Sequence, residues 1–244
     1  MSENASVAAC LAASADGRIW HPEVPVLGSD DDRQVLEAVR SQADVLLYGA
    51  GTARADSRRR IQFRYERYAA VAAARLARPV PPIAVLCRSL DFDFSSQFWT
   101  SDCPIAVVRD TSSAPSASPP EGVELLDVKP EASGKPPLAV VVRAVAAWAR
   151  RVLDGAADDR AVRVLCEGGG GLVGSLVRAG LLDELFLTVT PWVLGDGGTP
   201  AVSGTVAPAR LALREWRAGA DGEIFLRYCR PGAARWAPEG ITQP

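Results

Sequence analysis

A short apolar run followed by four consecutive glycines constrains this chain more than any other feature. The segment occupies residues 162–174 and reads VRVLCEGGGGLVG. Glycine is unfavourable inside strands and helices, so the strand is expected to end at Glu167 and the glycines to form a turn of bare backbone. Behind the turn, apolar residues recur at helical spacing from Leu172 onward. Because the free N–H groups and positive dipole end of a helix favour phosphate, this segment predicts a dinucleotide site.

The glycine spacing admits three interpretations. Gly169, Gly171 and Gly174 satisfy G-x-G-x-x-G, but a Rossmann domain also needs a ribose-binding acid about twenty residues on, at the end of the next strand. The next apolar run, at residues 185–190, ends in Thr-Pro instead. The pattern therefore favours a phosphate-cradling turn of another fold, with a Rossmann domain and a purely structural turn as alternatives.

Composition bounds the class of protein. A chain of 244 residues with 48% hydrophobic content can bury one substantial core, so we expect one domain over residues 1–244, with 230–244 as a flexible tail. The formal net charge of −2 argues against a general nucleic-acid binder. Five widely spaced cysteines without a C-x-x-C pair are typical of reduced thiols. With no signal-peptide pattern and no membrane-spanning run, the sequence predicts a cytoplasmic protein that binds neither membrane nor nucleic acid.

Apolar runs of strand length alternate with helical patterns along most of the chain. Besides the run before the glycines, strands are expected at residues 6–13, 44–48, 83–87, 105–108, 123–128 and 185–190, and helices at 30–42, 58–78 and 138–153. Ser29-x-x-Asp32 resembles a capping box at the start of the first helix. Residues 191–208 predict an open loop, and 210–216 with 223–229 a hairpin. This order predicts an α/β fold with a mixed, mostly parallel sheet and an antiparallel C-terminal hairpin.

A cluster of arginines follows the second strand, within residues 58–78. One interpretation is the solvated face of a helix. The other is that Arg58, Arg59 or Arg60 binds a phosphorylated ligand, because a guanidinium fork suits phosphate bidentately.

Three blocks together resemble a known family. They are SADGRI at residues 14–19, ADVLLYGAGTARAD at 43–56 and VLCEGGGGLVGSLVRAGLLDELFLTVTPWVLGDG at 164–197. They are similar to the pyrimidine reductase domain of riboflavin biosynthesis, without that family's deaminase domain. The resemblance implies a three-layer α/β/α, dihydrofolate-reductase-like fold and a homodimer. It also implies NADPH-dependent reduction of a small molecule, 5-amino-6-(5-phosphoribosylamino)uracil, at its opened sugar. His21 is the only histidine, so neither a zinc deaminase site nor any other metal site is expected.

The resemblance also implies where cofactor and substrate bind. A second glycine turn, Gly49-Ala50-Gly51-Thr52, follows the strand at residues 44–48. Backbone amides of this turn and of the turn at residues 167–172 would line the dinucleotide, and Arg88 and Ser89 would hold the 2′-phosphate that distinguishes NADPH from NADH. Asp56 falls on the first acid of the family's substrate motif, and Asp16 borders the same pocket. The residues implied for the cofactor are Gly49, Ala50, Gly51, Thr52, Arg88, Ser89, Glu167, Gly168, Gly169, Gly170, Gly171 and Leu172.

The proton that accompanies hydride transfer has several candidate sources. It can come from water or from a buried carboxylic acid, for which Asp56 and Glu167 are the candidates, with Asp16 nearby. Glu167 has an alternative role in orienting the glycine turn, and Asp56 in binding a substrate hydroxyl.

The sequence departs from the family on the substrate side. Asp56 is followed by Ser57 and Arg58 where the family has a second Asp and a Pro, and residues 21–28 lack the usual pattern. The sequence therefore supports the cofactor better than the substrate. A related heterocycle, an imine and a dihydrofolate-like compound are alternative substrates. The alternatives to a reductase are a protein that binds a nucleotide or pterin without turnover and a nucleic-acid-binding module.

Overall fold

The computed structural model describes residues 5–24, 26–110, 118–129, 137–154, 160–204, 208–233 and 236. Its strands are β1 (Ala5–Ser14), β2 (Arg18–Trp20), β3 (Val45–Gly49), β4 (Ile83–Cys87), β5 (Ile105–Asp110), β6 (Val123–Val128), β7 (Val162–Cys166), β8 (Glu184–Thr190), β9 (Thr199–Pro200), β10 (Ala212–Ala218) and β11 (Ile224–Cys229). Its helices are α1 (Asp30–Gln42), α2 (Ala50–Ala55), α3 (Glu66–Leu76), α4 (Leu138–Val152) and α5 (Gly170–Arg178), with 3-10 turns at Gln97–Thr100 and Gly195–Gly197.

Nine strands form one sheet in the order β10-β11-β8-β1-β7-β3-β4-β5-β6. From β8 to β6 every neighbouring pair is parallel, whereas β11 pairs antiparallel with both β8 and β10. A parallel strand needs a crossover connection, so helices come to cover both faces of the sheet. The expected mixed, mostly parallel sheet with a C-terminal antiparallel hairpin is confirmed.

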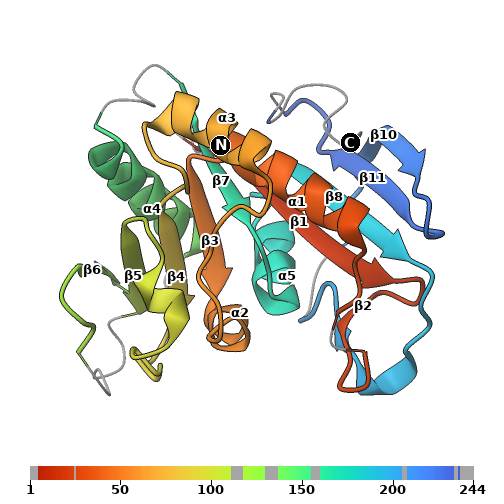
Figure 1. The fold of residues 1–244 in the computed structure, drawn as a ribbon, viewed down its shortest axis with the longest axis horizontal. Helices are drawn as coiled ribbons and strands as arrows, with labels where there is room; N and C mark the ends of the chain where they lie inside the picture. The colour runs from red at the N-terminus through yellow and green to blue at the C-terminus, as the bar shows by residue number, and fades with distance from the viewer. Residues whose placement is uncertain are drawn as a thin grey trace.

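The helices form two outer layers around the sheet (Figure 1). On one face, Val35 and Val39 of α1 pack in a core that includes Tyr48 and Phe98. On the other face, the apolar stripe of α4 and the first turns of α5 enter a second core with Val45 and Leu47 of the sheet. The alternation of buried side chains between the two faces of each strand supplies both cores, which is the three-layer α/β/α arrangement expected from the sequence.

Helix α1 has the bounds that the sequence predicts, but only one of the two hydrogen bonds of the predicted capping box forms. Ser29 is the N-cap, and its hydroxyl accepts a hydrogen bond from the Asp32 backbone N–H at 3.2 Å. The Ser29 N–H, however, donates to Glu223 in the turn between β10 and β11, 2.9 Å away. In a capping box, the Asp32 carboxylate would accept the Ser29 N–H. Here Glu223 accepts it, so Asp32 does not cap its own helix.

Two expected elements differ in the structure. The arginine-rich helix begins only at Glu66, because Glu37 of α1 accepts the backbone N–H groups of Arg64 and Tyr65 and holds the preceding segment in a non-helical path. The loop at residues 191–208 is not open where it is described. Its strand β9 pairs with β2, and its Ser203 N–H donates to the Gly170 carbonyl.

Part of the expected tail at residues 230–244 is described. Trp236 is 1% exposed and packs against Phe186, and its backbone N–H donates to Glu184 at 2.8 Å. This residue is therefore anchored in the core. Residues 234, 235 and 237–244 lie outside the described part of the chain, as do residues 111–117 between β5 and β6.

Candidate active site

A large cavity opens where the carboxyl ends of β1, β3, β4 and β7 meet. It measures about 1240 Å³ and is bordered by α1, α2 and α5 together with β2 and β9. In open α/β sheets this edge is where ligands bind. Single small-molecule sites usually span about 300–1,000 Å³, so the cavity has room for a dinucleotide and a second small molecule.

The two glycine turns face each other across this cavity. The Gly49 N–H at the end of β3 donates to the Gly168 carbonyl after β7, at 2.9 Å, and so joins the turns. Gly168 has φ +101°, a backbone conformation that glycine adopts without strain. A Cβ added at Gly169 would lie 3.3 Å from the Thr52 hydroxyl, in the space between the turns. Bare backbone therefore keeps this part of the cavity open.

The other glycines of the motif serve the packing of the chain. A Cβ on Gly170 would come within 2.1 Å of the Pro200 carbonyl oxygen, and one on Gly174 within 2.2 Å of the Ser203 carbonyl oxygen. The segment after β9 therefore lies directly against the start of α5. The G-x-G-x-x-G spacing of Gly169, Gly171 and Gly174 thus combines a cavity-facing position with a packing position, and the strand order is not that of a Rossmann fold.

Glu167 is held by a buried network. Both nitrogens Nε and Nη2 of Arg40 donate to its carboxylate at 2.8 and 2.7 Å, and the Tyr48 hydroxyl donates at 2.7 Å. The side chains of Arg40 and Glu167 are only 5% and 6% exposed. Burial favours the neutral acid, but the Arg40 charge and these hydrogen bonds outweigh it and hold the pKa of Glu167 below its ordinary value. Glu167 is therefore ionised and orients the start of the glycine turn.

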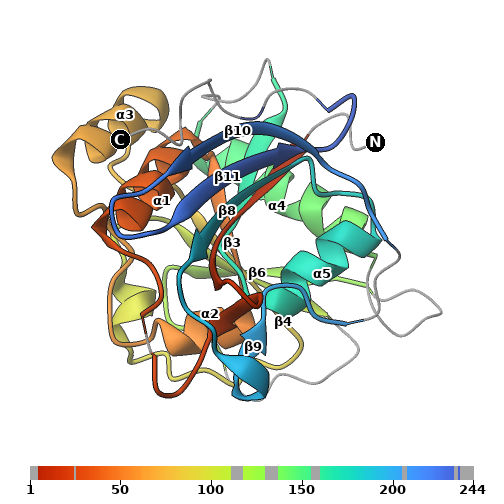
Figure 2. The ribbon, with the colours of Figure 1, turned by 90° about the vertical axis from the view of Figure 1, so that its right-hand side faces the viewer.

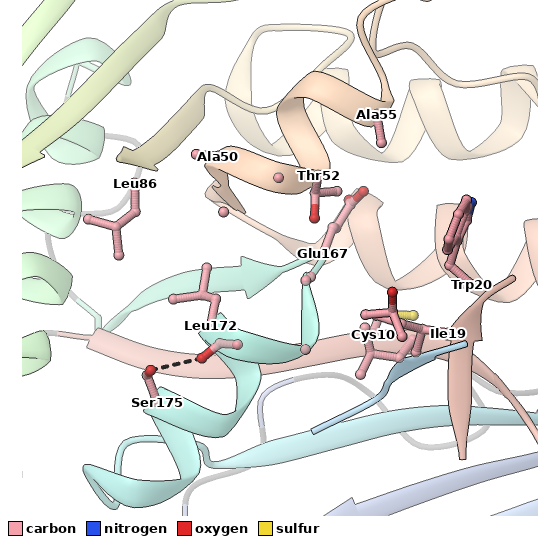
Figure 3. Close-up of a pocket in the computed structure, with 18 of the residues that line it drawn as sticks. Cys10, Ile19, Trp20, Ala50, Thr52, Ala55, Leu86, Glu167, Leu172 and Ser175 are labelled. Atoms are coloured by element: carbon pink, nitrogen blue, oxygen red, sulfur yellow. Dashed lines mark hydrogen bonds between the residues drawn. The ribbon is translucent and has the colours of Figure 1, made fainter. Parts of the chain in front are cut away.

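The residues implied for the cofactor all line the cavity. Figure 3 shows Leu86 and Leu172 at one end, Trp20, Ile19 and Cys10 at the other, and Thr52 and Glu167 between them. The set comprises Gly49, Ala50, Gly51, Thr52, Arg88, Ser89, Glu167, Gly168, Gly169, Gly170, Gly171 and Leu172. The fold thus brings together residues that the sequence separates by more than a hundred positions.

Several lining residues were not singled out from the sequence. Arg33, Arg54 and Arg178 also reach the cavity, and so does Asp32 of α1. Arg33 and Asp32 lie in a helix whose sequence signal was only its apolar stripe and cap. A long charged side chain gives no periodic signal of its own, so only the position of α1 beside the strand ends identifies these residues.

Asp16 lies outside the lining of the cavity. Its carboxylate accepts the Ser14 hydroxyl at 2.6 Å and the backbone N–H groups of Leu194 and Gly195 at 3.0 and 2.7 Å. These hydrogen bonds, that of Ser14 first, lower the pKa of Asp16 to about 2. This exposed carboxylate therefore links the turn after β1 to the loop after β8 by hydrogen bonds. A catalytic role for Asp16 stays a prediction.

The residues predicted on the substrate side are also absent from the cavity lining. Asp56 caps α2 and accepts the Nε–H of Arg59 at 2.9 Å, and Arg60 donates to the Thr100 hydroxyl at 3.1 Å. Arg58, Arg59 and Arg60 are all exposed. The Asp56 side chain is 16% exposed, so it is largely buried although it lies outside the cavity lining. Substrate binding by Asp56 and by these arginines stays a prediction.

The fold and the cavity define a class of protein: a three-layer α/β domain with a glycine-lined site at the strand ends. Comparison with known proteins identifies the family within this class. A family model, the RibD C-terminal domain, matches residues 5–225. The chain therefore belongs to the RibD C-terminal domain family, the reductase family of riboflavin biosynthesis. No curated protein sequence matches it.

Solved structures agree on the fold. A pyrimidine reductase-like protein from Corynebacterium diphtheriae is 24% identical, with 92% of this chain and 91% of that chain covered and a TM-score of 0.72. The riboflavin biosynthesis reductase Rib7 of Saccharomyces cerevisiae is 16% identical, with 93% and 90% covered and a TM-score of 0.64. Dihydrofolate reductase from Enterococcus faecalis, complexed with NADP(H), is 16% identical, with 93% and 96% covered and a TM-score of 0.51. The expected resemblance to dihydrofolate reductases is confirmed at the level of the fold.

Among the residues that the structure describes, no helix has the length and apolar character needed to cross a membrane, and no cluster of His, Cys, Asp or Glu suits a metal ion.

Proposed function

We propose that this protein is an NADPH-dependent reductase of a small heterocycle or imine. The observation that carries the proposal is the cavity at the strand ends, lined by two facing glycine turns and large enough for a dinucleotide beside a second molecule. Membership of a reductase family supports the same reaction class. The first candidate substrate is 5-amino-6-(5-phosphoribosylamino)uracil, and a related heterocycle or imine is the second.

The cavity fits a dinucleotide at its glycine turns. The first N–H groups of a helix have no partner within the helix, so those at the start of α5 are available to a pyrophosphate. The space between Gly169 and Thr52, which a single Cβ would enter, allows phosphate oxygens to approach the main chain. Arg88 and Ser89, which follow β4, supply a cation and a hydroxyl suited to a phosphomonoester.

The bound nicotinamide would supply the hydride. The chain's own contribution is to position the acceptor, because a near-attack geometry by itself can contribute several kcal/mol to catalysis. Ile19 and Trp20 line the end of the cavity away from Leu172 and offer an apolar surface for a planar ring (Figure 3). Leu36 also belongs to the lining. The ionised Glu167 keeps both glycine turns in register through Arg40 and Tyr48 and holds no proton to donate.

Turnover assays test the proposal and separate its alternatives. Oxidation of NADPH is followed with the phosphorylated pyrimidine, with its dephosphorylated form, and with a panel of cyclic imines and dihydropterins. Turnover of any of them supports the reductase class, and the rates decide the substrate. Tight NADPH binding without any turnover would favour a binding protein, and failure to bind NADPH would refute the proposal altogether.

Cofactor preference is the first expected outcome. NADPH should bind at least about tenfold more tightly than NADH, because a charge-assisted contact to the 2′-phosphate contributes about 1.5–3 kcal/mol. Arg88→Ala should remove most of this preference by weakening NADPH binding alone. Titration of protein fluorescence measures both affinities, and Arg143→Ala, an exposed arginine on α4, is the matched control. Equal affinities in the wild type would contradict the assignment of Arg88 and Ser89.

The proposed assembly is a homodimer formed through the three-stranded end of the sheet. One face of β8, β11 and β10 carries only apolar or aromatic side chains, and Figure 2 shows these strands crossing the front of the view. Leu187, Leu226 and Trp216 lie in register on this face, and Trp216 is 66% exposed. The opposite face of the same strands packs Phe186 and Phe225 against the α1 side of the core. An apolar sheet face of this extent is typical of a surface buried between subunits.

Trp216→Glu should therefore shift the protein from dimer to monomer, because a carboxylate buried between apolar sheet faces has no partner. Light scattering after size-exclusion chromatography measures the mass, with Trp192→Glu, another exposed tryptophan outside the three strands, as the control. A monomeric wild type, or a Trp216→Glu variant that stays dimeric, would refute this interface.

A further inference from the structure

A second cavity lies beside α5, separate from the cavity at the strand ends. It measures about 350 Å³ and is lined by α5, by β8 and by the segments that precede β10 and follow β11. We call it the α5–β8 pocket. Its described lining shares no residue with the described lining of the larger cavity. Small-molecule sites usually span about 300–1,000 Å³, so the pocket suits a compact ligand rather than a dinucleotide.

Most of the described lining of the α5–β8 pocket is apolar. Val173 and Val177 come from α5, and Leu185 comes from β8. Val202 follows β9, and Leu211 directly precedes β10. Removal of apolar surface from water is favourable, so this lining favours an alkyl or aryl group as the occupant.

Two arginines carry the charge of this pocket, and its described lining contains no acid. Arg210 is exposed and forms no hydrogen bond or ion pair with any residue that the structure describes. The Arg230 side chain is 33% exposed and donates through Nη2 to Asp183, which lies outside the lining, and its Nε–H has no acceptor among the described residues. A carboxylate is a strong acceptor for guanidinium groups, so the two arginines favour an anionic end on the occupant.

Helix α5 forms a wall of both cavities. Leu172 and Ser175 line the cavity at the strand ends (Figure 3), whereas Val173 and Val177 line the α5–β8 pocket. Residues three or four positions apart share one face of a helix, so each cavity is bordered by its own face of α5.

The segment after β9 connects the pocket to the first turn of α5. Its Ser203 N–H donates to the Gly170 carbonyl at 3.1 Å, and the neighbouring Val202 lines the pocket. An occupant that contacts Val202 together with Val173 and Val177 therefore packs this segment against α5. Such contacts oppose local opening of the helix that begins at the glycine turn.

We propose that the α5–β8 pocket is a second ligand site, which takes a small apolar carboxylate and stabilises α5. The carboxylate lies at Arg210 and Arg230, and the apolar part of the ligand lies among the valine and leucine side chains. The site goes beyond the proposed reductase activity, and its occupation needs neither cofactor nor substrate.

Calorimetric titration with octanoate tests the site, with octanol as the neutral ligand of the same chain length. Octanol should bind at least about tenfold more weakly, because it offers no charge to the two arginines. Arg210→Met keeps an apolar side chain and should weaken octanoate binding by about threefold or more, since solvent partly screens an exposed charge. Val177→Phe should abolish binding by filling the pocket, and circular dichroism checks its fold. Arg88→Ala, which removes an arginine of the larger cavity, is the matched control and should bind octanoate as the wild type does.

Hydrogen exchange measures the effect on α5. At an octanoate concentration about ten times its dissociation constant, amides of residues 170–178 should exchange up to about tenfold more slowly, because opening of α5 requires release of the ligand. Amides of α1, which does not line the pocket, should exchange at an unchanged rate.

Several results would overturn this inference. They are no octanoate binding by the wild type, equal binding of octanol, and unchanged exchange in α5 at saturation. Binding that is lost in Arg88→Ala but kept in Arg210→Met would place octanoate in the larger cavity. Binding only in the Trp216→Glu variant would show that the partner subunit fills the pocket. Octanoate binding with slowed α5 exchange in a protein that does not bind NADPH would support this site and refute the proposed function.

Discussion

Replacing Glu167 with glutamine is expected to lower the free energy of unfolding by about 3–5 kcal/mol, because it leaves Arg40 buried without its counter-charge. The two side chains are only 5% and 6% exposed and share two hydrogen bonds of 2.8 and 2.7 Å. Glutamine keeps the size of the residue and can still accept the Tyr48 hydroxyl, so the change isolates the charge. Urea denaturation at neutral pH measures the loss.

Two comparisons sharpen this result. Arg40→Met combined with Glu167→Gln removes both charges, so the double variant should be less destabilised than the sum of the single changes. Glu124→Gln breaks the exposed pair with Arg151, whose side chains are 41% and 60% exposed, and should cost less than about 1 kcal/mol. An equal loss in Glu167→Gln and Glu124→Gln would show that the buried pair does not hold the turn.

The pH dependence of the same variant has a definite sign. The Glu167 pKa is lowered in the folded protein, so its stabilisation is present above the ordinary carboxyl pKa and is lost as pH falls through the folded value. The stability gap between wild type and Glu167→Gln should accordingly narrow in acid. A gap that widens in acid would contradict an ionised Glu167.

Substitution of Gly169 is expected to abolish cofactor binding while leaving the protein folded. A Cβ there would sit 3.3 Å from the Thr52 hydroxyl, in the space where phosphate would meet the main chain, and a β-branched side chain fills more of it. NADPH affinity should fall in the order glycine, alanine, valine, by about 100-fold or more for Gly169→Val. Fluorescence titration measures the affinity, and circular dichroism checks the fold.

Gly170→Ala is the informative comparison. Its Cβ would approach the Pro200 carbonyl oxygen to 2.1 Å, so this change should lower the melting temperature rather than act on binding alone. Normal NADPH binding by a folded Gly169→Val protein would mean that the glycine turn is structural only.

Local signals in the sequence were sufficient for much of the fold. The apolar stripe and Ser29 cap predict α1 over residues 30–42, and the β-branched runs predict β4 and β6 with the observed bounds. Both glycine turns were located because glycine after an apolar run is unfavourable in either regular structure. Local signals failed for the start of α3, because the residue that holds the preceding segment, Glu37, lies 27 positions from Arg64.

The sequence by itself determined the order of most elements, the reductase family and the two glycine turns that line the cavity, because these depend on short-range patterns of apolar residues and glycine. Only the tertiary structure decided that Glu167 is ionised and that Glu223, not Asp32, accepts the Ser29 N–H. Arg40 meets Glu167 across 127 positions, and Glu223 reaches Ser29 across 194. Charge and hydrogen-bonding partners set the state of a buried carboxyl, and such partners come together only when the chain has folded.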